Sequence, residues 1–331
     1  FVKTSKKEFL KKILSAKYRV LCTEKSKNST IGIAEVILKE LDAQHEIFIV
    51  EMGAYKIGEI KEICSIVKPN IGIITGINEQ HIELFGSLSQ TRKAKYELVE
   101  ALPQNGLAVF NADNQYTRLM AKQTRNKTVL LYGNTKDAQV RISHLSQQPT
   151  QLSFTLELNK IEFAVKTPLL GKHFALNIAA AAAVAYYLKL SQSTIKQQIT
   201  HLTSAQSGMK VAKYLNGAAM IDNTFNANPD SVKAAVDYLT VYSGKKYLIL
   251  TPLIELGKQG PSIHEDLGKY IGKKCDGLIV TNKRYFKQLK LGLDKFAPKC
   301  SLTIASGKKA AQLVRKTVAL QDGVVFAGKE T

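Results

Sequence analysis

The sequence contains no long apolar run and no cluster of cysteines. No tract of about 18 uncharged apolar residues occurs among the 331 residues, so we expect no membrane-spanning segment. The nearest candidate, residues 174–188, is shorter, rich in alanine and carries Asn177, which favours a packed helix. The four cysteines are scattered and form neither a CxxC pair nor a His/Cys cluster. This pattern predicts reduced, mostly buried thiols in a cytoplasmic protein.

Acidic residues are also scarce. The chain has 27 Asp and Glu residues against 47 Lys and Arg residues, a formal charge of +20, which suggests anionic partners such as nucleotides, nucleic acids or membrane surfaces. The basic residues are spread along the chain, however, and there is no aromatic signature of RNA binding. We therefore interpret the charge as a solvated basic surface and expect no nucleic-acid partner.

Short apolar segments alternate with helical patterns in the first part of the chain. Helical patterns cover 5–16, 30–40, 56–67, 88–102 and 114–123. The segments between them are typical of strands buried on both faces: YRVLC, EIFIVEM, IGIIT, LAVFN and TVLLY. This alternation predicts an α/β fold whose sheet is mostly parallel and carries helices on both faces.

Residues 138–170 interrupt this alternation. The segment QLSFTLELNKIEFAVK predicts a hairpin that turns near Asn159 and Lys160. Helices at 174–189 and 193–202 follow, and TSAQSG is typical of a linker. Strand-like segments then alternate with helical ones again: AAMID, KYLILT, DGLIVT, SLTIA and GVVFA. We therefore predict two domains, 1–205 and a smaller α/β domain at 206–331.

A polar loop follows the predicted strand that ends at Asp222. In IDNTFNANPDSVKAAVDYL, Pro229 stands where a helix begins and Asn228 is a natural N-cap. The loop lies at the carboxyl end of a strand and the start of a helix, where α/β sheets bind ligands. An ordinary capped turn explains these residues equally well.

Glu51 and His81 each come after an apolar strand. A carboxylate and an imidazole at neighbouring strand ends could share a divalent metal ion. A single histidine at a strand end is more often structural, so the pattern alone leaves both interpretations open.

Six segments in order resemble the Mur ligase family, the ATP-dependent amide ligases of cell-wall precursor synthesis. They are residues 51–60, 81–97, 111–114, 171–180, 222–231 and 255–264, the last with Glu255 and His264. The similarity covers nearly the whole chain and is greatest to the MurF type, which joins D-alanyl-D-alanine to a UDP-N-acetylmuramoyl-tripeptide. It implies a central ATP-binding domain with a P-loop-type sheet, followed by a smaller Rossmann-like domain.

The resemblance implies ATP and Mg²⁺ as cofactors, UDP-MurNAc-peptide and D-alanyl-D-alanine as partners, and an acyl phosphate intermediate. Lys3, Thr4 and Ser5 match the end of the family's phosphate loop, with Lys3 on the phosphates and the Thr4 hydroxyl on Mg²⁺. Val2 stands in place of the last glycine and does not readily adopt a positive φ. The earlier glycines and their strand are not among these residues, so we expect an incomplete, weakly active or inactive fragment.

Other site residues are implied by the same resemblance. Glu51 and His81 would hold the Mg²⁺ nearest the reacting carboxylate, and Asn177 would hydrogen-bond the adenine. In the second domain, Asp222 and Asn223 would face the nucleotide. The residues expected to bind substrate there are Asn226, Asn228, Asp230 and His264.

Lys95 shares a helix face with apolar residues, because Leu98, Val99 and Leu102 lie three, four and seven positions after it. Most such lysines extend to water. Burial would instead favour the neutral amine, which can take up CO₂ and become a carbamate that binds Mg²⁺. Some Mur ligases carry a carbamoylated lysine at the matching place, so the resemblance makes Lys95 a candidate catalytic and metal-binding residue, with Lys3 and His81.

The sequence departs from the family pattern at several positions. Gly76 stands where asparagine is frequent, Asn223 and Phe225 replace the second acid and the tyrosine of a D-D-x-Y motif, and Gly208 replaces an arginine. These changes are compatible with a divergent subfamily, an altered substrate or lost activity. Alternative functions are a ligase resembling folylpolyglutamate or cyanophycin synthetase, and a non-catalytic basic module that binds nucleotides or nucleic acid. The segment NTFNANPDS favours the MurF type.

Overall fold

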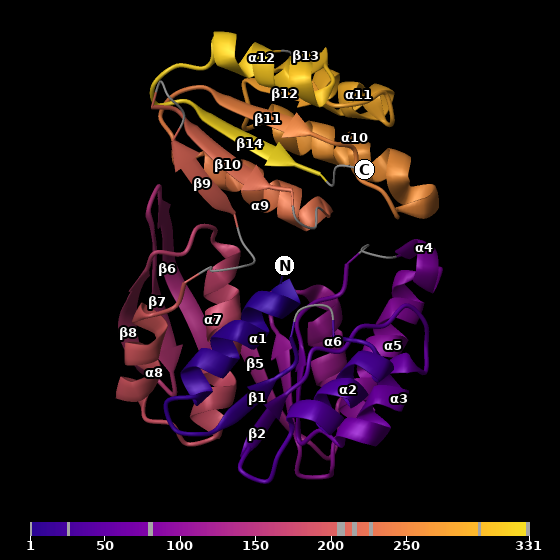
Figure 1. Ribbon diagram of the computed structural model, residues 1–331, viewed down its shortest axis with the longest axis vertical. Helices are drawn as coiled ribbons and strands as arrows, with labels where there is room; N and C mark the ends of the chain where they lie inside the picture. Colours follow the sequence, from indigo (N-terminus) through magenta and orange to yellow (C-terminus); the bar gives the residue numbers. More distant parts are fainter. Residues whose placement is uncertain are drawn as a thin grey trace. The chain divides into compact units, whose positions relative to one another are not determined.

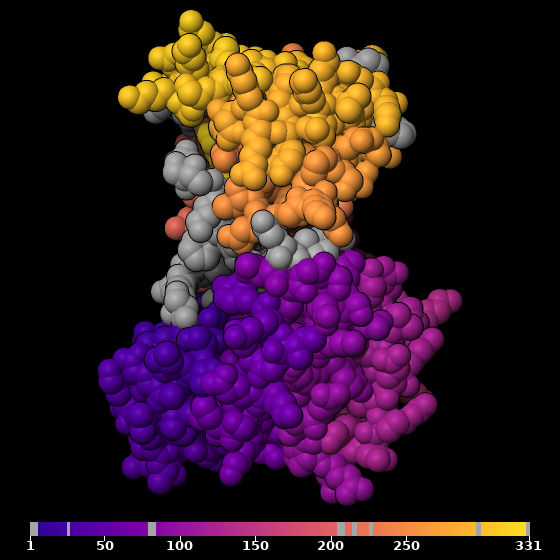
Figure 2. Space-filling view, turned by 90° about the vertical axis from the view of Figure 1, so that its right-hand side faces the viewer, coloured from indigo at the N-terminus to yellow at the C-terminus, as the bar shows by residue number. Residues whose placement is uncertain are grey.

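The computed structural model describes residues 2–24, 27–78, 82–203, 209–213, 217–224, 228–296 and 299–328, with side chains from Lys6 onward except those of Ile82 and Glu83. The chain divides into two compact units (Figure 1). The first comprises residues 2–146 and 151–204, and the second comprises residues 205–331 with 147–150. In Figure 2 each unit presents a continuous surface of side chains, indigo to magenta for the first and orange to yellow for the second.

The first unit contains a parallel pair of strands, β1 (Val20–Cys22) and β2 (Ile47–Ile49), and a separate six-stranded sheet. That sheet has the order β3-β4-β5-β6-β7-β8, in which β3 to β6 pair in parallel and β7 with β8 antiparallel. Its strands are β3 (Ile71–Ile74), β4 (Leu107–Asn111), β5 (Thr128–Gly133), β6 (Val140–Gln148), β7 (Gln151–Leu158) and β8 (Ile161–Thr167).

Helices connect these strands and cover them (Figure 1). They are α1 (Val2–Leu14), α2 (Thr30–Glu40), α3 (Glu59–Val67), α4 (Ile82–Phe85), α5 (Leu88–Glu100), α6 (Gln115–Gln123), α7 (His173–Tyr187) and α8 (Gln192–Thr200). Serine or asparagine side chains cap the amino ends of α2, α5, α6 and α8, as expected for residues that satisfy the free N–H groups of a first turn.

The main core of the first unit forms where α7 packs against α1 and the sheet. The run of alanines from Ala179 to Ala183 is buried, and such small side chains permit close packing on all sides of the helix. The rings of Phe9 on α1 and Phe174 on α7 lie 5.7 Å apart, in the range favoured by aromatic pairs. The packing of α1 on α7 therefore joins the two ends of this unit's sequence.

The second unit is a six-stranded sheet of order β13-β12-β11-β14-β10-β9 with helices around it. All neighbours pair in parallel except β9 with β10. The strands are β9 (Lys210–Lys213), β10 (Ala219–Asn223), β11 (Lys246–Leu250), β12 (Gly277–Val280), β13 (Ser301–Ile304) and β14 (Gly323–Ala327). The helices are α9 (Pro229–Leu239), the short 3₁₀ turn η1 (Gly257–Gln259), α10 (Gly260–Gly272), α11 (Phe286–Phe296) and α12 (Gly307–Thr317).

The structure confirms the α/β class and most predicted elements. The hairpin of β7 and β8, the helix 30–40, the start of α9 at Pro229 and its Asn228 cap all occur as predicted. All four cysteines are buried and free. No helix in the part of the chain that the structure describes is long and apolar enough to cross a membrane.

Two features of the fold differ from the sequence-based prediction. Strands β6 and β9 were not predicted, because most of their residues are polar. Strands β1 and β2 do not join the larger sheet, although their buried character suggested one sheet.

Candidate functional site

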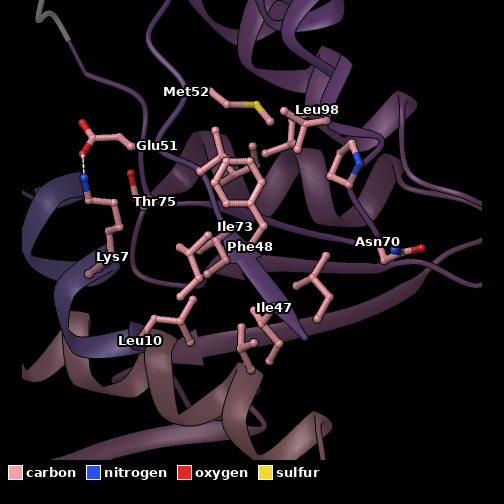
Figure 3. Close-up of a pocket in the computed structure, with 18 of the residues that line it drawn as sticks. Lys7, Leu10, Ile47, Phe48, Glu51, Met52, Asn70, Ile73, Thr75 and Leu98 are labelled. Carbon is pink, nitrogen blue, oxygen red and sulfur yellow. Dashed lines mark ion pairs between the residues drawn. The ribbon is translucent and has the colours of Figure 1, made fainter. Parts of the chain in front are cut away.

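The first candidate site lies where β2 and β3 end and α1 begins. Glu51 follows β2, and its carboxylate lies 3.7 Å from the ammonium nitrogen of Lys7 on α1 (Figure 3). Lys7 Nζ also donates to the backbone carbonyl of Thr23, and the Glu51 N–H donates to Thr23 Oγ1 at 3.3 Å. The carboxylate predicted to bind Mg²⁺ is thus fixed beside the first helix.

Lys95 lies in the same region. Its Nζ donates to the backbone carbonyl of Gly76, just after β3, at 3.2 Å. Lys95 lines a cavity of about 470 Å³ together with Lys7, Glu51 and Thr75. Its predicted helix face is confirmed, because Val99 and Leu102 on that face are buried. Glu51 and Lys95 therefore line the same cavity, although they lie far apart in the sequence.

Asparagines of the NADN segment hold the loop that follows β3. Asn111 Nδ2 donates to the carbonyl of Thr75 at 3.2 Å, and Asn114 Nδ2 donates to that of Ile77 at 3.0 Å. Asn114 Oδ1 also caps α6 by accepting from Thr117 N. These bonds fix the backbone that presents the Gly76 carbonyl to Lys95. The segment was part of the resemblance, but no role had been predicted for its residues.

A buried lysine lies beside the first candidate site. Lys6 on α1 donates from Nζ to the hydroxyl of Tyr132 on β5 at 2.9 Å. Burial lowers the pKa of Lys6 to about 7 and raises the pKa of Tyr132 above its usual range. This pair was not predicted, because Lys6 stands among several lysines on an amphipathic helix.

Asn177 on α7 is 1% exposed, and neither Oδ1 nor Nδ2 has a hydrogen-bond partner in the part of the chain that the structure describes. One turn earlier, the buried Nδ1 of His173 likewise has none. Burial lowers the pKa of His173 to about 4, so its imidazole is neutral at pH 7. Because buried polar groups are normally paired, these atoms are the ones expected to meet a polar ligand.

The residues of this site are compatible with a bound Mg²⁺. Among the described residues no group of three or more His, Cys, Asp or Glu side chains could hold a metal ion. Mg²⁺, however, commonly binds one or two carboxylates and completes its shell with water and phosphate oxygens. Glu51 supplies one such carboxylate, and Lys95 would supply a second as a carbamate. Because Glu51 is paired with Lys7, an ion would have to share or replace that contact.

In the second unit, the predicted polar loop is built around the start of α9. Asp222 at the end of β10 accepts from the N–H of Thr224 at 3.0 Å, and Asn223 Nδ2 donates to the Ser231 carbonyl at 3.1 Å. Asn228 and Ser231 form a reciprocal capping box. These bonds define the loop, and Asp230 lies exposed in the first turn of α9.

His264 is fully buried in the second unit. Its Nε2 accepts from the N–H of Leu253 at 3.0 Å, Nδ1 lies 2.7 Å from the carbonyl of Gly260, and the ring stacks on Tyr285. Both ring nitrogens are thus used by the backbone. The resemblance predicts that His264 binds substrate. Because both ring nitrogens are in use, His264 would contribute by holding the backbone of Leu253 and Gly260 in place.

Several predicted residues fall outside this description. Lys3, Thr4 and Ser5 belong to the first turn of α1, but their side chains are not described. His81, Phe225, Asn226 and Gly208 lie outside the described residues. Their roles remain predictions.

Glu97 is a site residue that the sequence analysis did not single out. Its carboxylate is buried and accepts from the N–H groups of Gly58 at 2.6 Å and Lys61 at 2.9 Å, at the amino end of α3. It lies two positions after Lys95, on the same helix as that lysine. Its carboxylate stabilises the helix that leads from β2 to β3.

Comparisons with known proteins assign both units to the same family of ligases. The family model described as "Mur ligase middle domain" matches residues 3–185, and that described as "Mur ligase, glutamate ligase domain" matches residues 209–330. The chain is 32% identical over 253 residues to the UDP-N-acetylmuramoyl-tripeptide–D-alanyl-D-alanine ligase of Haemophilus influenzae, covering 76% of this chain and 54% of that protein. It is 29% identical to the ligase of the same name from Bacillus subtilis, covering 88% of this chain and 61% of that protein.

Solved structures show the same fold. MurF from Thermotoga maritima, determined in complex with ADP, superposes with a TM-score of 0.87 at 24% identity, covering 99% of this chain and 74% of that chain. MurF from Acinetobacter baumannii superposes with a TM-score of 0.87 at 24% identity, covering 99% of this chain and 71% of that chain. The chain thus spans little more than half of the length of the curated relatives that it matches.

Proposed function

Since the chain belongs to the Mur ligase family, we propose that it carries the central (1–205) and C-terminal (206–331) domains of an ATP-dependent amide ligase. The proposed reaction joins D-alanyl-D-alanine to UDP-N-acetylmuramoyl-tripeptide. The name of the Haemophilus influenzae relative supports this choice of substrates. The protein would act in the cytoplasm, in the synthesis of peptidoglycan precursors.

The observation that carries the proposal is that the Lys7–Glu51 pair and Lys95 line one cavity at the ends of β2 and β3. In the proposed reaction the substrate carboxylate attacks the γ-phosphorus of ATP, and ADP leaves. The dipeptide amine then attacks the acyl phosphate, loses a proton and displaces phosphate, so that an amide forms. In both steps negatively charged carboxylate and phosphate oxygens come close together, and a lysine and a bound cation stabilise this charge.

The roles of the described residues follow from their positions. Lys7 holds the Glu51 carboxylate at the end of β2, and the Gly76 carbonyl holds Lys95 at the end of β3. Glu51 would bind Mg²⁺, with His81 and with Lys95 as its carbamate. The ion would neutralise the phosphate and carboxylate oxygens. Lys3, Thr4 and Ser5 would bind the phosphates of ATP.

Asn177 would bind the adenine base. Among the described residues neither the donor nor the acceptor of this buried amide is paired, and such a group matches the edge of adenine, which offers both. In the second domain, Asp222 and Asn223 would face the nucleotide. The residues proposed to bind substrate are Asn226, Asn228, Asp230 and His264.

The proposal can be tested with Glu51→Gln, which keeps the shape of the side chain and removes its charge. In a form that carries a complete phosphate loop, this change should lower ATP-dependent amide formation about 100-fold or more. The matched control is Glu46→Gln, which alters an exposed carboxylate just before β2. Equal activity of Glu51→Gln and the wild type would refute the proposed role of Glu51.

The alternative ligases differ in their substrates. Product formation with folate and glutamate, or with an aspartate polymer and arginine, in place of the muramoyl substrate would favour one of them. DNA binding that weakens steeply with salt and does not respond to ATP would favour a non-catalytic basic module.

A further inference from the structure

The positive charge of the second unit is concentrated in one stretch of its sequence. Residues 273–316 hold 12 Lys and Arg residues against 2 Asp and Glu residues, whereas the rest of 205–331 holds 8 of each. The stretch contains β12, α11, β13 and α12. Of its two helices, α12 has the larger excess of charge, because it carries four cations and no acidic residue.

Helix α12 lies on one face of the second sheet. Helix α10 contacts both α9 and α11, so these three helices share a face. The chain moves outward from β11 to β13 through α10 and α11 and returns to β14 through α12 (Figure 1), and right-handed crossovers place the returning helix on the opposite face. Ala310 and Val314 of α12 belong to one core with Tyr247 and Ile249 of β11. The other side of α12 is therefore turned away from the sheet.

The outward side of α12 is a basic face about two turns long. Lys308 and Arg315 lie seven positions apart, as do Lys309 and Lys316, so each pair forms a row along the helix. Leu313 lies in the second row, because it follows Lys309 by four positions and precedes Lys316 by three. All five side chains are exposed. We call this set of five residues the α12 face.

The cations of the α12 face form no ion pair within the described part of the chain, although lysines of α10 and α11 do. Lys308 and Lys309 also stand in the first turn of α12, which has no acidic residue. The amino end of a helix is the positive end of its dipole, so cations there destabilise the helix. The arrangement thus lowers the stability of the chain by itself, and an anionic partner would offset this loss.

The α12 face suits an anionic bilayer better than a nucleic acid. Leu313 is 39% exposed between Lys309 and Lys316. A leucine among cations matches the interface of a bilayer, where acyl chains adjoin the phosphates. Clusters of about four to eight Lys and Arg residues on an amphipathic helix are typical of surfaces that bind acidic phospholipids. Proteins that bind single-stranded nucleic acid commonly use exposed aromatic rings, and α12 contains none.

We propose that the α12 face docks on a bilayer that contains acidic phospholipids. The four cations lie near the lipid phosphates, and Leu313 enters the boundary between the headgroups and the acyl chains. Because the apolar side of α12 is buried in the second unit, the helix stays on the bilayer surface and the association is reversible. The proposal concerns a partner of the second unit and is independent of the proposed reaction.

Co-sedimentation of the 331-residue chain with lipid vesicles tests the proposal. The chain should bind vesicles of phosphatidylcholine with about 30% phosphatidylglycerol at about 0.15 M salt, and should bind vesicles of phosphatidylcholine alone far less. Each cation near an acidic bilayer contributes about fivefold to binding. The variant Lys308→Gln/Lys309→Gln/Arg315→Gln/Lys316→Gln should therefore lower the partition coefficient at least about 100-fold.

The matched control removes four charges from exposed positions of the first unit, in the variant Lys122→Gln/Lys136→Gln/Lys160→Gln/Lys196→Gln. It should bind acidic vesicles within about threefold of the wild type, because salt screens charges that do not touch the bilayer. Equal losses in the two variants would show that net charge alone governs binding, and the proposal would be overturned. Failure of the wild type to bind acidic vesicles would overturn it as well.

Two further measurements address nucleic acid and folding. If the four α12 replacements weaken binding to a labelled single-stranded oligonucleotide and leave vesicle binding intact, the α12 face binds nucleic acid and the proposal is wrong. The same variant should unfold at a temperature no lower than that of the wild type, because it relieves the repulsion at the amino end of α12. If its unfolding temperature falls instead, the single variant described next, which keeps all four cations, decides.

A tryptophan at position 313 reports on the bilayer directly, because the chain contains no other tryptophan. The fluorescence of Leu313→Trp should shift to the blue when acidic vesicles are added, since the indole leaves water. Leu119→Trp, at a position 44% exposed on α6 of the first unit, should show no shift. An unchanged spectrum of Leu313→Trp, or an equal shift at both positions, would contradict docking through α12.

Discussion

The ammonium nitrogen of Lys7 lies 3.7 Å from the carboxylate of Glu51, and the two side chains are 6% and 14% exposed. This pair joins the first helix to the end of β2. Removal of one charge from a buried pair is costly, because the other charge remains in a poorly solvated place.

Lys7→Met should therefore destabilise the first unit by about 2–4 kcal/mol. The double variant Lys7→Met/Glu51→Gln should recover part of this loss, because no uncompensated charge remains. Urea unfolding of the two single variants and the double variant measures the coupling. A double variant that loses the sum of the two single losses would show that the pair contributes nothing.

Lys6 should make stability depend on pH. Its pKa is about 7 in the folded chain and near 10.5 when unfolded, so the unfolded chain binds more protons between these values. The free energy of unfolding should consequently rise with pH across this window, by up to about 1.4 kcal/mol per pH unit. Below pH 7 Lys6 is charged in both states, so its burial lowers stability by the full amount. Lys6→Met should flatten the curve, and its gain in stability should be greatest at pH 7 and below and should shrink as pH rises. Lys12→Met, on the exposed side of α1, is the control, and parallel curves for wild type and Lys6→Met would contradict the prediction.

Asn177→Leu should change stability and nucleotide binding in opposite directions. Loss of a buried amide that has no hydrogen-bond partner among the described residues should raise the free energy of unfolding by about 1 kcal/mol. ATP affinity in a form with a complete phosphate loop should fall about tenfold or more. Asn111→Leu is the contrasting case, because Asn111 is buried with its hydrogen bonds made, and it should destabilise by about 1–3 kcal/mol. Calorimetry and urea unfolding measure both effects, and unchanged ATP affinity in Asn177→Leu would remove Asn177 from the site.

Lys95 should form a carbamate. With ¹³C-labelled bicarbonate, the wild type should show a carbamate signal by NMR that Lys95→Arg lacks. In a form with a complete phosphate loop, Lys95→Ala should lose about 100-fold in activity, and added formate should restore a part. Absence of the signal together with full activity of Lys95→Ala would show that Lys95 does not act as a metal-binding carbamate.

His264 should limit the acid stability of the second unit. Burial lowers the pKa of His264 below its usual 6.5, and Nε2 must stay unprotonated to accept from Leu253. The folded state therefore binds fewer protons than the unfolded one, and stability is lost as pH falls below about 6.5. His264→Gln should unfold more easily at neutral pH, with a weaker dependence on pH. The control is His201→Gln, at an exposed position; identical acid sensitivity of wild type and His264→Gln would contradict the assignment.

Local sequence patterns were sufficient for most elements of the fold. LAVFN became β4 without a change of bounds, and 30–40 became α2, because hydrophobic runs and caps act within a few residues. Strand β6 was missed because polar residues alternate with Val140 and Ile142 in it, and its pairing with β5 is a tertiary contact.

The site was predictable in its residue types and not in its contacts. Spacing placed Lys95 on the apolar face of its helix, but its acceptor, the Gly76 carbonyl, comes from a loop 19 positions away. Lys7 and Lys6 resembled ordinary solvated lysines on a basic helix, and nothing local distinguishes them from Lys11 or Lys12. Their partners Glu51 and Tyr132 are brought near by the fold alone.

The contact between α1 and α7 has a consequence for biosynthesis. Phe9 and Phe174 belong to the same core, so during synthesis helix α1 lacks its packing partner until about 165 further residues have been translated. Until then its apolar face, with Leu10 and Ile13, is exposed to solvent or to chaperones. At the ordinary rate of translation, about 5–20 residues per second, this interval lasts roughly 10–30 seconds. The core that α1 shares with α7 can therefore form only after residue 174 has been translated.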